Sequence, residues 1–356
     1  MTDIQEFQQI LREHITRYPL MCPQDYGKLA FQNEFGPEHI VLDKEIFSLS
    51  LRNEWEAVHD DGLPRFPENI GNNLCRFHLT KTGDLETAVP LLTKLCVLTA
   101  QKVAGTASGL AENLACLDAL DIAGMTNWLA EYRNQGCPAV HHSHTYRKAY
   151  HPHYRLLQTE YAGYFPILLQ IAKLAQAGRA AIISIDGRCG SGKTRLAELI
   201  HALIPCNIVH MDDYYLPMSH RAYNWTELPG GNIDFSRIFD EVIVPLRQRE
   251  TIMYRPFDCA SGSYRTATCL PVRPLTIVEG SYSQHPRLAK HYDLAIFLTC
   301  TPDVQIHRLR QREGRQFASF EQRWIPMEEN YIRICAPNQK SDFWVDTSGF
   351  FDCPLG

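Results

Sequence analysis

The sequence feature that most constrains the fold is a short apolar run followed by a glycine-rich turn, over residues 180–194. The turn reads Gly187-Arg188-Cys189-Gly190-Ser191-Gly192-Lys193-Thr194 and matches the pattern G-x-x-x-x-G-K-[ST] at every fixed position. Glycines allow the backbone to bring successive N–H groups close to a phosphate chain, where a side chain would intrude. The residues that follow have helical spacing, so the positive end of a helix dipole also faces the phosphates. The stretch predicts a strand, a phosphate-binding loop and a helix start.

The loop also predicts a nucleotide and a divalent cation as cofactors. Lys193 supplies a mobile cation for the β- and γ-phosphates of ATP, and the Thr194 hydroxyl is suited to ligate Mg²⁺. Cys189 lies inside this anion-binding loop, which favours a lowered pKa for its thiol. The residues expected to bind the nucleotide are Gly187, Arg188, Cys189, Gly190, Ser191, Gly192, Lys193, Thr194 and Arg195.

Two further apolar runs end in carboxylates. Residues 207–211 lead into Asp212 and Asp213, and residues 275–278 lead into Glu279. In an open parallel α/β sheet, ligands bind at the carboxyl ends of the strands. Phosphoryl transfer to a hydroxyl requires a carboxylate that orients the acceptor and takes its proton, so Asp212 or Asp213 is the candidate base. Glu279 is expected to hold Mg²⁺ or a water bound to it.

Residues 302–315 combine a helical pattern with four arginines, directly after a buried-strand pattern at 292–299. Arginines on a short helix commonly form a solvated face. Downstream of a phosphate loop, the same spacing favours a lid whose cations stabilise charge on the transferring phosphoryl group. We assign this catalytic role, together with that of Lys193, to Arg308 and Arg312.

The order of these segments resembles the uridine kinase and phosphoribulokinase family of P-loop kinases. The resemblance covers about residues 178–350 and includes Gly187–Thr194, Met211–Tyr215, Ile233-Asp234, Val278–Gly280 and the arginine-rich helix. The doubled aspartate in the same order is similar to that of nicotinamide riboside kinases as well. The resemblance implies an α/β fold with a parallel sheet flanked by helices.

The resemblance also implies roles for individual acidic residues. The first aspartate after the second strand is the base toward the acceptor hydroxyl in that family, and it matches Asp212. Asp234 and Asp258 are implied to contact the acceptor, and we expect Asp213 and Tyr215 to bind it beside the base. The chain departs from uridine kinases at residues 234–236, where Asp-Phe-Ser stands in place of Asp-His-Pro.

The length of 356 residues suits about two domains. Residues 1–154 predict a mainly helical domain of unknown role, with helical patterns near 4–15, 86–103 and 109–133. A further helical pattern at 164–175 precedes the first strand of the phosphate-loop domain. We therefore expect a domain boundary near residue 155, with residues 155–356 forming the P-loop kinase-like domain.

Residues 141–155 hold five of the fifteen histidines. Their spacing fits no ligand pattern that fixes a metal geometry, and the segment contains no acidic residue, so a solvated or substrate-facing loop is favoured over a metal site. Arg147, Lys148 and Arg155 are interleaved with tyrosines, which would suit a phosphate or an aromatic ring. The sequence leaves these alternatives open.

Composition excludes several classes of partner. A net charge of −5, a pI near 6.3 and the lack of a basic tract argue against nucleic acid. No apolar run approaches the ~18 residues needed to cross a bilayer, and no signal peptide begins at Met1, so we expect a cytoplasmic protein without a membrane partner. The twelve cysteines include no C-x-x-C pair. A homo-oligomer is left open.

Together these features predict ATP-dependent phosphorylation of a hydroxyl on a small molecule, a nucleoside or related riboside. The alternative is a nucleotide-binding regulatory protein, an ATP or GTP switch that acts through the helical domain. Residues 339–342, Gln-Lys-Ser-Asp, come within one residue of the guanine-reading pattern N-K-x-D, but Glu279-Gly280 lacks the D-x-x-G of such switches. We interpret residues 336–345 as the loop and strand around an adenine base.

Overall fold

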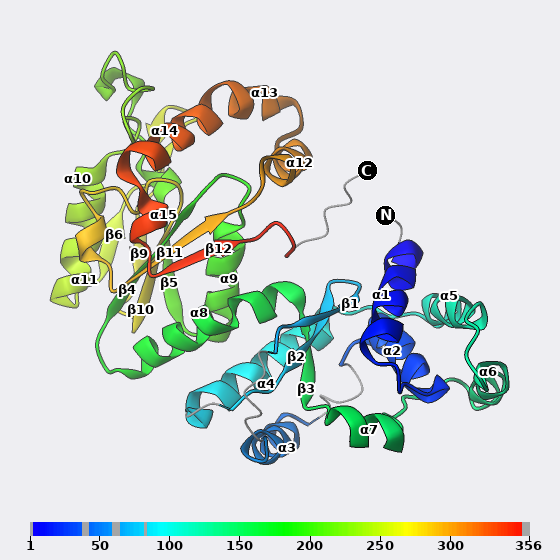
Figure 1. Ribbon diagram of the computed structural model, residues 1–356. Coiled ribbons are helices and arrows are strands. Elements are labelled where there is room, and N and C mark those ends of the chain that lie inside the picture. Colours follow the sequence, from blue (N-terminus) through cyan, green and yellow to red (C-terminus); the bar gives the residue numbers. More distant parts are fainter. Residues whose placement is uncertain (1–2, 38–42, 59–64, 82–83, 351–356) are drawn as a thin grey trace. The chain divides into compact units, whose positions relative to one another are not determined.

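The computed structural model describes residues 3–37, 43–58, 65–81 and 84–350 (Figure 1). It divides into two compact units, which we call the N-terminal unit (Met1–Leu169 with Phe350–Gly356) and the C-terminal unit (Gln170–Gly349). The division falls inside helix α8 (Thr159–Gln176), whereas the sequence suggested a boundary near residue 155. No helix in the described ranges combines the length and the apolar character needed to span a bilayer.

The N-terminal unit is mainly helical but also contains a small antiparallel sheet in the order β1-β2-β3. The patterns near residues 4–15 and 86–103 are confirmed as helices, whereas the pattern at 109–133 is broken into two helices at Gly124, which has φ 79°. The elements are α1 (Asp3–Arg17), α2 (Pro23–Phe35), α3 (Lys44–Glu56), β1 (Glu68–Gly71), β2 (Leu74–His78), α4 (Leu85–Lys102), α5 (Ala107–Asp118), α6 (Met125–Asn134), α7 (His144–Tyr150) and β3 (Tyr154–Gln158).

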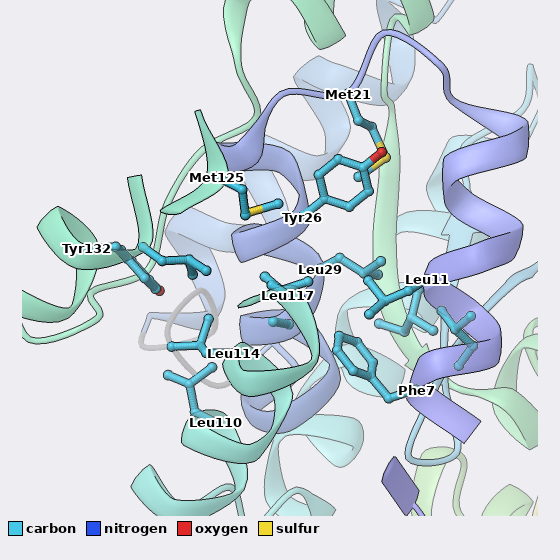
Figure 2. Close-up of a cluster of buried hydrophobic side chains, with 14 of the residues drawn as sticks. Phe7, Leu11, Met21, Tyr26, Leu29, Leu110, Leu114, Leu117, Met125 and Tyr132 are labelled. Carbon is cyan, nitrogen blue, oxygen red and sulfur yellow. The ribbon is translucent and has the colours of Figure 1, made fainter. Parts of the chain in front are cut away.

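A hydrophobic core holds the helices of the N-terminal unit together. Leu110, Leu114 and Leu117 of α5 are spaced four and three residues apart, so they share one helix face. Figure 2 shows that this face meets side chains of α1, α2 and α6, including Phe7 and Leu29. Burial of each such side chain contributes about 1.5–3 kcal/mol, which explains why short helices with modest propensity are stable here.

The C-terminal unit is built on a parallel five-stranded sheet in the order β12-β11-β4-β10-β5. The strands predicted before the phosphate loop, before Asp212, before Glu279 and at 292–299 are confirmed. The strands β4 and β10 are buried along their whole length, as expected for the centre of a parallel sheet. The strands are β4 (Ala181–Gly187), β5 (Cys206–His210), β10 (Leu275–Glu279), β11 (Leu294–Thr299) and β12 (Phe343–Asp346).

Helices flank this sheet (Figure 1), as predicted from the sequence. Helix α9 packs against β4, β10 and β5, and residues of α10, η3, α11 and α14 form one hydrophobic cluster with Ile182, Val209 and Val278 of the sheet. The helical elements are α9 (Lys193–Leu203), η1 (Met211–Tyr214), η2 (Met218–His220), α10 (Phe235–Ile238), η3 (Phe239–Ile243), α11 (Val244–Gln248), η4 (Ala289–His291), α12 (Pro302–Glu313), η5 (Gly314–Gln316), α13 (Phe317–Ser319), η6 (Phe320–Trp324), α14 (Ile325–Cys335) and α15 (Pro337–Lys340). Two hairpin sheets complete the unit, one of β6 (Ile252–Tyr254) with β9 (Thr268–Leu270) and one of β7 (Phe257–Asp258) with β8 (Ser263–Tyr264).

Candidate active site

The phosphate loop, Gly187–Thr194, connects the end of β4 to the start of α9. Gly187 has φ 142°, and a Cβ on it would lie 1.9 Å from the carbonyl oxygen of Leu298 on β11, so no other residue fits there. Gly190 and Gly192 also have positive φ, 77° and 91°. The glycines of the sequence pattern are thus required by the backbone, because they allow the chain to turn sharply from a buried strand into a helix N-terminus.

Lys193 opens α9 and folds back over the loop. Its Nζ donates hydrogen bonds to the carbonyl oxygens of Gly187 (2.8 Å) and Arg188 (3.0 Å) and lies 3.3 Å from the Ser281 hydroxyl. The lysine is therefore held at the mouth of the loop by backbone oxygens. Arg195 is exposed on the first turn of α9.

Thr194 and Glu279 meet across the edge of the sheet. In the strand register, Glu279 of β10 lies between Ile185 of β4 and His210 of β5. The Thr194 hydroxyl donates to Glu279 Oε1 at 3.2 Å, and His210 Nδ1 lies 2.5 Å from the same oxygen. This hydrogen bond to the carboxylate raises the pKa of His210. A hydroxyl and a buried carboxylate are oxygen ligands of the kind that Mg²⁺ prefers, so the pair fits the predicted metal.

The two aspartates after β5 lie in the short helix η1 and differ in environment. Asp212 is exposed and accepts a hydrogen bond from the Tyr215 hydroxyl at 2.9 Å. Asp213 is partly buried and accepts from the Tyr254 hydroxyl at 3.0 Å. Burial raises the pKa of Asp213 above its usual value. The two carboxylates are therefore not equivalent, although they are neighbours in the chain.

Three aromatic rings extend from Asp212. The ring centre of Tyr215 lies 6.1 Å from that of Trp324 on η6, which lies 6.3 Å from that of Trp225. The guanidinium of Arg221 stacks over Trp225 at 4.6 Å. Sequence reasoning missed both tryptophans, because they are about a hundred positions apart and belong to no motif. Together the rings offer flat surfaces beside an exposed carboxylate.

Asp234 and Asp258 lie in segments next to η1. Asp234 caps α10 by accepting from the Arg237 backbone N–H at 3.1 Å, and its own N–H donates to the Tyr214 carbonyl at 2.8 Å. Asp258 ends β7, which lies beside η1, and its carboxylate is 3.6 Å from the Arg265 guanidinium. Each acid thus has a local partner in addition to any substrate role.

The two arginines assigned to the lid differ in their contacts. Arg308 of α12 donates to the Gly190 carbonyl at 3.2 Å and to the Thr347 carbonyl at 2.8 Å, so it fastens α12 to the phosphate loop and to the end of β12. Arg312 is exposed near the end of α12 and donates to Glu313 at 2.5 Å. A catalytic role for either arginine stays a prediction.

Acidic residues of α14 contact the phosphate loop, which the sequence did not indicate. The Cys189 backbone N–H donates to Glu328 at 2.8 Å, and the Ser281 hydroxyl donates to the other oxygen of Glu328 at 2.5 Å. The Arg188 guanidinium donates to both oxygens of Glu329, at 2.5 and 2.9 Å. A carboxylate thus holds an N–H of a loop whose amides are suited to phosphate.

Asp186, which directly precedes the loop, is a second residue that sequence reasoning missed. It is 1% exposed and accepts four hydrogen bonds: from the backbone N–H groups of Gly187 (2.7 Å), Tyr282 (3.2 Å) and Gln284 (2.9 Å), and from the Tyr331 hydroxyl (2.7 Å). Burial raises the pKa of Asp186 to about 6. This carboxyl ties the loop to the turn after β10 and to α14.

The expected lowering of the Cys189 pKa is wrong. The thiol is buried, and both burial and the nearby Glu328 carboxylate raise its pKa. Position in an anion-binding loop was a poor guide, because burial disfavours the thiolate and the Glu328 carboxylate adds to this effect.

Comparison with known proteins gives relatives for part of the chain. No protein-family model matches it. Uridine kinases of Bacillus thuringiensis (strain Al Hakam) and Bacillus cereus (strain AH820) are each 27% identical over 175 residues, which cover 43% of this chain and 80% of the relative. A possible uridine kinase from Bacillus stearothermophilus aligns in structure over 50% of this chain and 97% of its own, with 19% identity and a TM-score of 0.40. A putative fructose transport system kinase from Silicibacter sp. TM1040 aligns over 51% and 97%, with 19% identity and a TM-score of 0.41. The sequence relatives and the parallel sheet support a P-loop kinase of the uridine kinase and phosphoribulokinase-like family over about half of the chain.

Proposed function

We propose that the C-terminal unit transfers the γ-phosphoryl group of ATP to a hydroxyl of a small molecule, a nucleoside or a related riboside. The observation that carries this proposal is the arrangement at the carboxyl edge of three adjacent strands. The phosphate loop follows β4, Glu279 ends β10, and Asp212 follows β5. A phosphate loop alone occurs in proteins with many different reactions. An exposed carboxylate two strands away adds a group that can orient and deprotonate an acceptor hydroxyl.

The chain's own residues suffice to position the reactants. The loop amides and Lys193 hold the phosphates, and Thr194 with Glu279 would hold Mg²⁺, which neutralises phosphate charge when bound. Asp212 orients the acceptor hydroxyl and takes its proton as the oxygen bonds to the γ-phosphorus, while the bond to the leaving ADP oxygen breaks. Each group that stabilises the transferring charge contributes about 2–4 kcal/mol to lowering the barrier.

Asp212 is the better candidate for the base than Asp213. Asp212 is exposed, so an acceptor can reach it, and Tyr215 is the only side chain of the described residues that bonds to it. Asp213 is partly buried, accepts from Tyr254 and has a raised pKa. A carboxyl in that setting is better suited to fix the shape of the pocket than to exchange protons with a substrate.

A ring-bearing acceptor is supported by the aromatic side chains beside Asp212. Tyr215, Trp324 and Trp225 follow one another at ring distances of 6.1 and 6.3 Å, and flat rings of this kind stack on a nucleobase. The similarity to proteins named uridine kinase also supports a nucleoside-like acceptor. Since Phe235 stands where uridine kinases carry histidine, the preferred base is open among nucleosides and other ribosides.

The test is ADP formation with ATP and a panel of uridine, cytidine, adenosine, guanosine, nicotinamide riboside, ribose and pantothenate. We expect one acceptor to stimulate turnover. Asp212→Asn should lower kcat with that acceptor by about 100-fold or more and leave the KM for ATP unchanged. Asp213→Asn is the matched control and should retain most of the kcat. Equal acceptor-stimulated rates in wild type and Asp212→Asn would remove Asp212 from the mechanism.

The contact between α14 and the phosphate loop favours a second candidate, a nucleotide-controlled switch. Any phosphate that takes the Cys189 N–H must displace Glu328 from it, so nucleotide binding would change the position of α14. Binding of ATP or GTP without stimulation by any acceptor of the panel would favour this second function over the first.

A further inference from the structure

The N-terminal unit contains a cavity of about 300 Å³ that the proposed kinase reaction does not use. Its apolar wall includes Phe47 of α3, Cys96 of α4 and Leu156 of β3, all of which are buried. Its polar side includes Lys28 of α2 and Arg155 of β3. A concave site with apolar walls and a few convergent polar groups is the usual form of a small-molecule site, and this volume is at the small end of that range.

Three lining residues of the cavity, Gln32, His142 and Tyr154, belong to one continuous hydrogen-bond network. Arg76, which is fully buried, donates to the Gln32 side-chain oxygen at 3.0 Å, and Gln32 donates to the Tyr154 hydroxyl at 3.2 Å. The Tyr154 hydroxyl lies 2.6 Å from Nε2 of His142, whose Nδ1 lies 3.0 Å from the buried Asp25 carboxylate. Burial lowers the pKa of His142 to about 4, so its ring is neutral and links the two partners. Hydrogen bonds to buried partners therefore hold these lining side chains in place.

Lys28 forms no direct ion pair with this network, although the nearby Asp25 carboxylate attracts its charge. Its Nζ donates to the Val140 carbonyl at 2.9 Å, and no carboxylate of the described residues forms an ion pair with it. Burial, assisted by the positive charge of Arg76, lowers the pKa of Lys28 to about 8. Burial outweighs the attraction of Asp25, so an anion that contacts the ammonium directly from the cavity would offset its desolvation.

The charged side chains that line the cavity are mostly positive. Among the described residues that line it, Lys28, Arg147 and Arg155 carry positive charge and Glu54 carries negative charge, an excess of two positive charges. Glu54 accepts from Arg155 at 2.7 Å, but Nε of Arg155 is buried and has no hydrogen-bond partner within the described part of the chain. Arg155 also lies over the Phe47 ring at 5.6 Å, so a cation and an apolar face meet at one point.

We propose that this cavity is a binding site for a small organic anion, a phosphate or carboxylate group attached to an apolar or ring-shaped body. The anionic group pairs with Lys28 and Arg155, and the body packs against Phe47 and Leu156. No group of three or more potential metal ligands occurs among the described residues, so a metal does not account for the site. This gives Arg147, Tyr154 and Arg155 a role without a metal and does not depend on the kinase reaction.

The first test reads Lys28 directly in the wild-type full-length protein. Acetylation of Lys28 by a dilute reagent near neutral pH is followed by mass spectrometry, with the exposed Lys148 as internal reference. Phenyl phosphate and benzoate are the probes, and phenol is the neutral match. At about ten times its Kd, an anion that pairs with Lys28 slows acetylation about ten-fold, because only about a tenth of the sites stay free. Protection by phenyl phosphate alone identifies a phosphate site, and protection by benzoate alone identifies a carboxylate site. Either result supports the proposal.

The second test measures affinity by calorimetry in a Lys193→Ala background, so that the phosphate loop does not contribute. Lys28→Met should lower the affinity for the protecting anion about ten-fold or more, since it removes the charge and keeps the apolar stem. Lys148→Met removes the same charge outside the cavity and should have no effect. Unchanged acetylation of Lys28 with both anions, or equal protection by phenol, would overturn the proposal even if Lys28→Met fails to fold.

Discussion

The contact between Glu328 and the phosphate loop leads to a definite prediction for Glu328→Gln. The Glu328 carboxylate accepts from the Cys189 N–H at 2.8 Å and from the Ser281 hydroxyl at 2.5 Å, and the residue is only 6% exposed. A nucleotide phosphate that takes the Cys189 N–H must displace this carboxylate and then lies near its negative charge. Glutamine keeps the size of the side chain but removes the charge, so the loop is held less tightly and binds ATP more tightly.

The size of the effect follows from the two hydrogen bonds. A bond to a charged acceptor is worth about 1 kcal/mol more than a bond to a neutral one. Glu328 makes two such bonds, so the substitution shifts the balance by about 1–2 kcal/mol in favour of ATP. With about 1.4 kcal/mol for each factor of ten, the affinity for ATP should rise about 5- to 30-fold.

Calorimetric titration with ATP, with and without Mg²⁺, measures this change. Glu321→Gln is the matched control, because it removes the same charge from an exposed position on η6 and should bind ATP as the wild type does. An unchanged or lower affinity in Glu328→Gln would refute the reasoning, since Glu328 would then be indifferent to ATP or would help to bind it.

Two further predictions concern buried polar groups. Asp186→Asn replaces one carboxylate oxygen by a donor that faces other donors, so the midpoint of thermal unfolding should drop by an amount that corresponds to about 3–5 kcal/mol. An unchanged midpoint would contradict the hydrogen-bond pattern. For His142, the pKa of about 4 in the folded state lies below the ordinary value of 6.5, so the unfolded chain binds the proton more tightly. The neutral His142 ring therefore contributes about 3 kcal/mol to the free energy of unfolding. This contribution is fully present above pH 6.5 and is lost as the pH falls toward 4. Urea denaturation between these pH values should show a smaller loss in His142→Gln than in wild type; equal losses would count against it.

The parallel sheet and the phosphate loop could be predicted because each depends on neighbours in the chain. The run 181–186 is apolar enough for a central strand, and the glycines after it are required by backbone geometry at positions such as Gly187. The sheet of the N-terminal unit could not be predicted in the same way. Its middle strand, β2, has the fully buried Arg76 at its centre, and that charge is tolerated only because Gln32 and Glu68 come from other elements.

In the candidate site as well, residues in local motifs could be predicted and residues brought in by distant segments could not. Lys193, Thr194 and Glu279 follow from motifs and strand ends, and the structure brings Thr194 and Glu279 into contact. Glu328 lies 139 positions after the loop residue that it contacts, so only the tertiary fold reveals it. The error for the Cys189 thiol has the same origin, because its pKa depends on burial and on that distant carboxylate.

The central claim is transfer of a phosphoryl group from ATP to a small molecule, and label transfer tests it most directly. The protein is incubated with γ-labelled ATP, Mg²⁺ and the panel of nucleosides, ribosides and alcohols, and the products are separated. We predict that the label appears on one acceptor, and that Lys193→Ala lowers its rate by about 100-fold or more with an unchanged melting temperature. Release of the label as inorganic phosphate alone, or equal transfer by Lys193→Ala, would contradict the account.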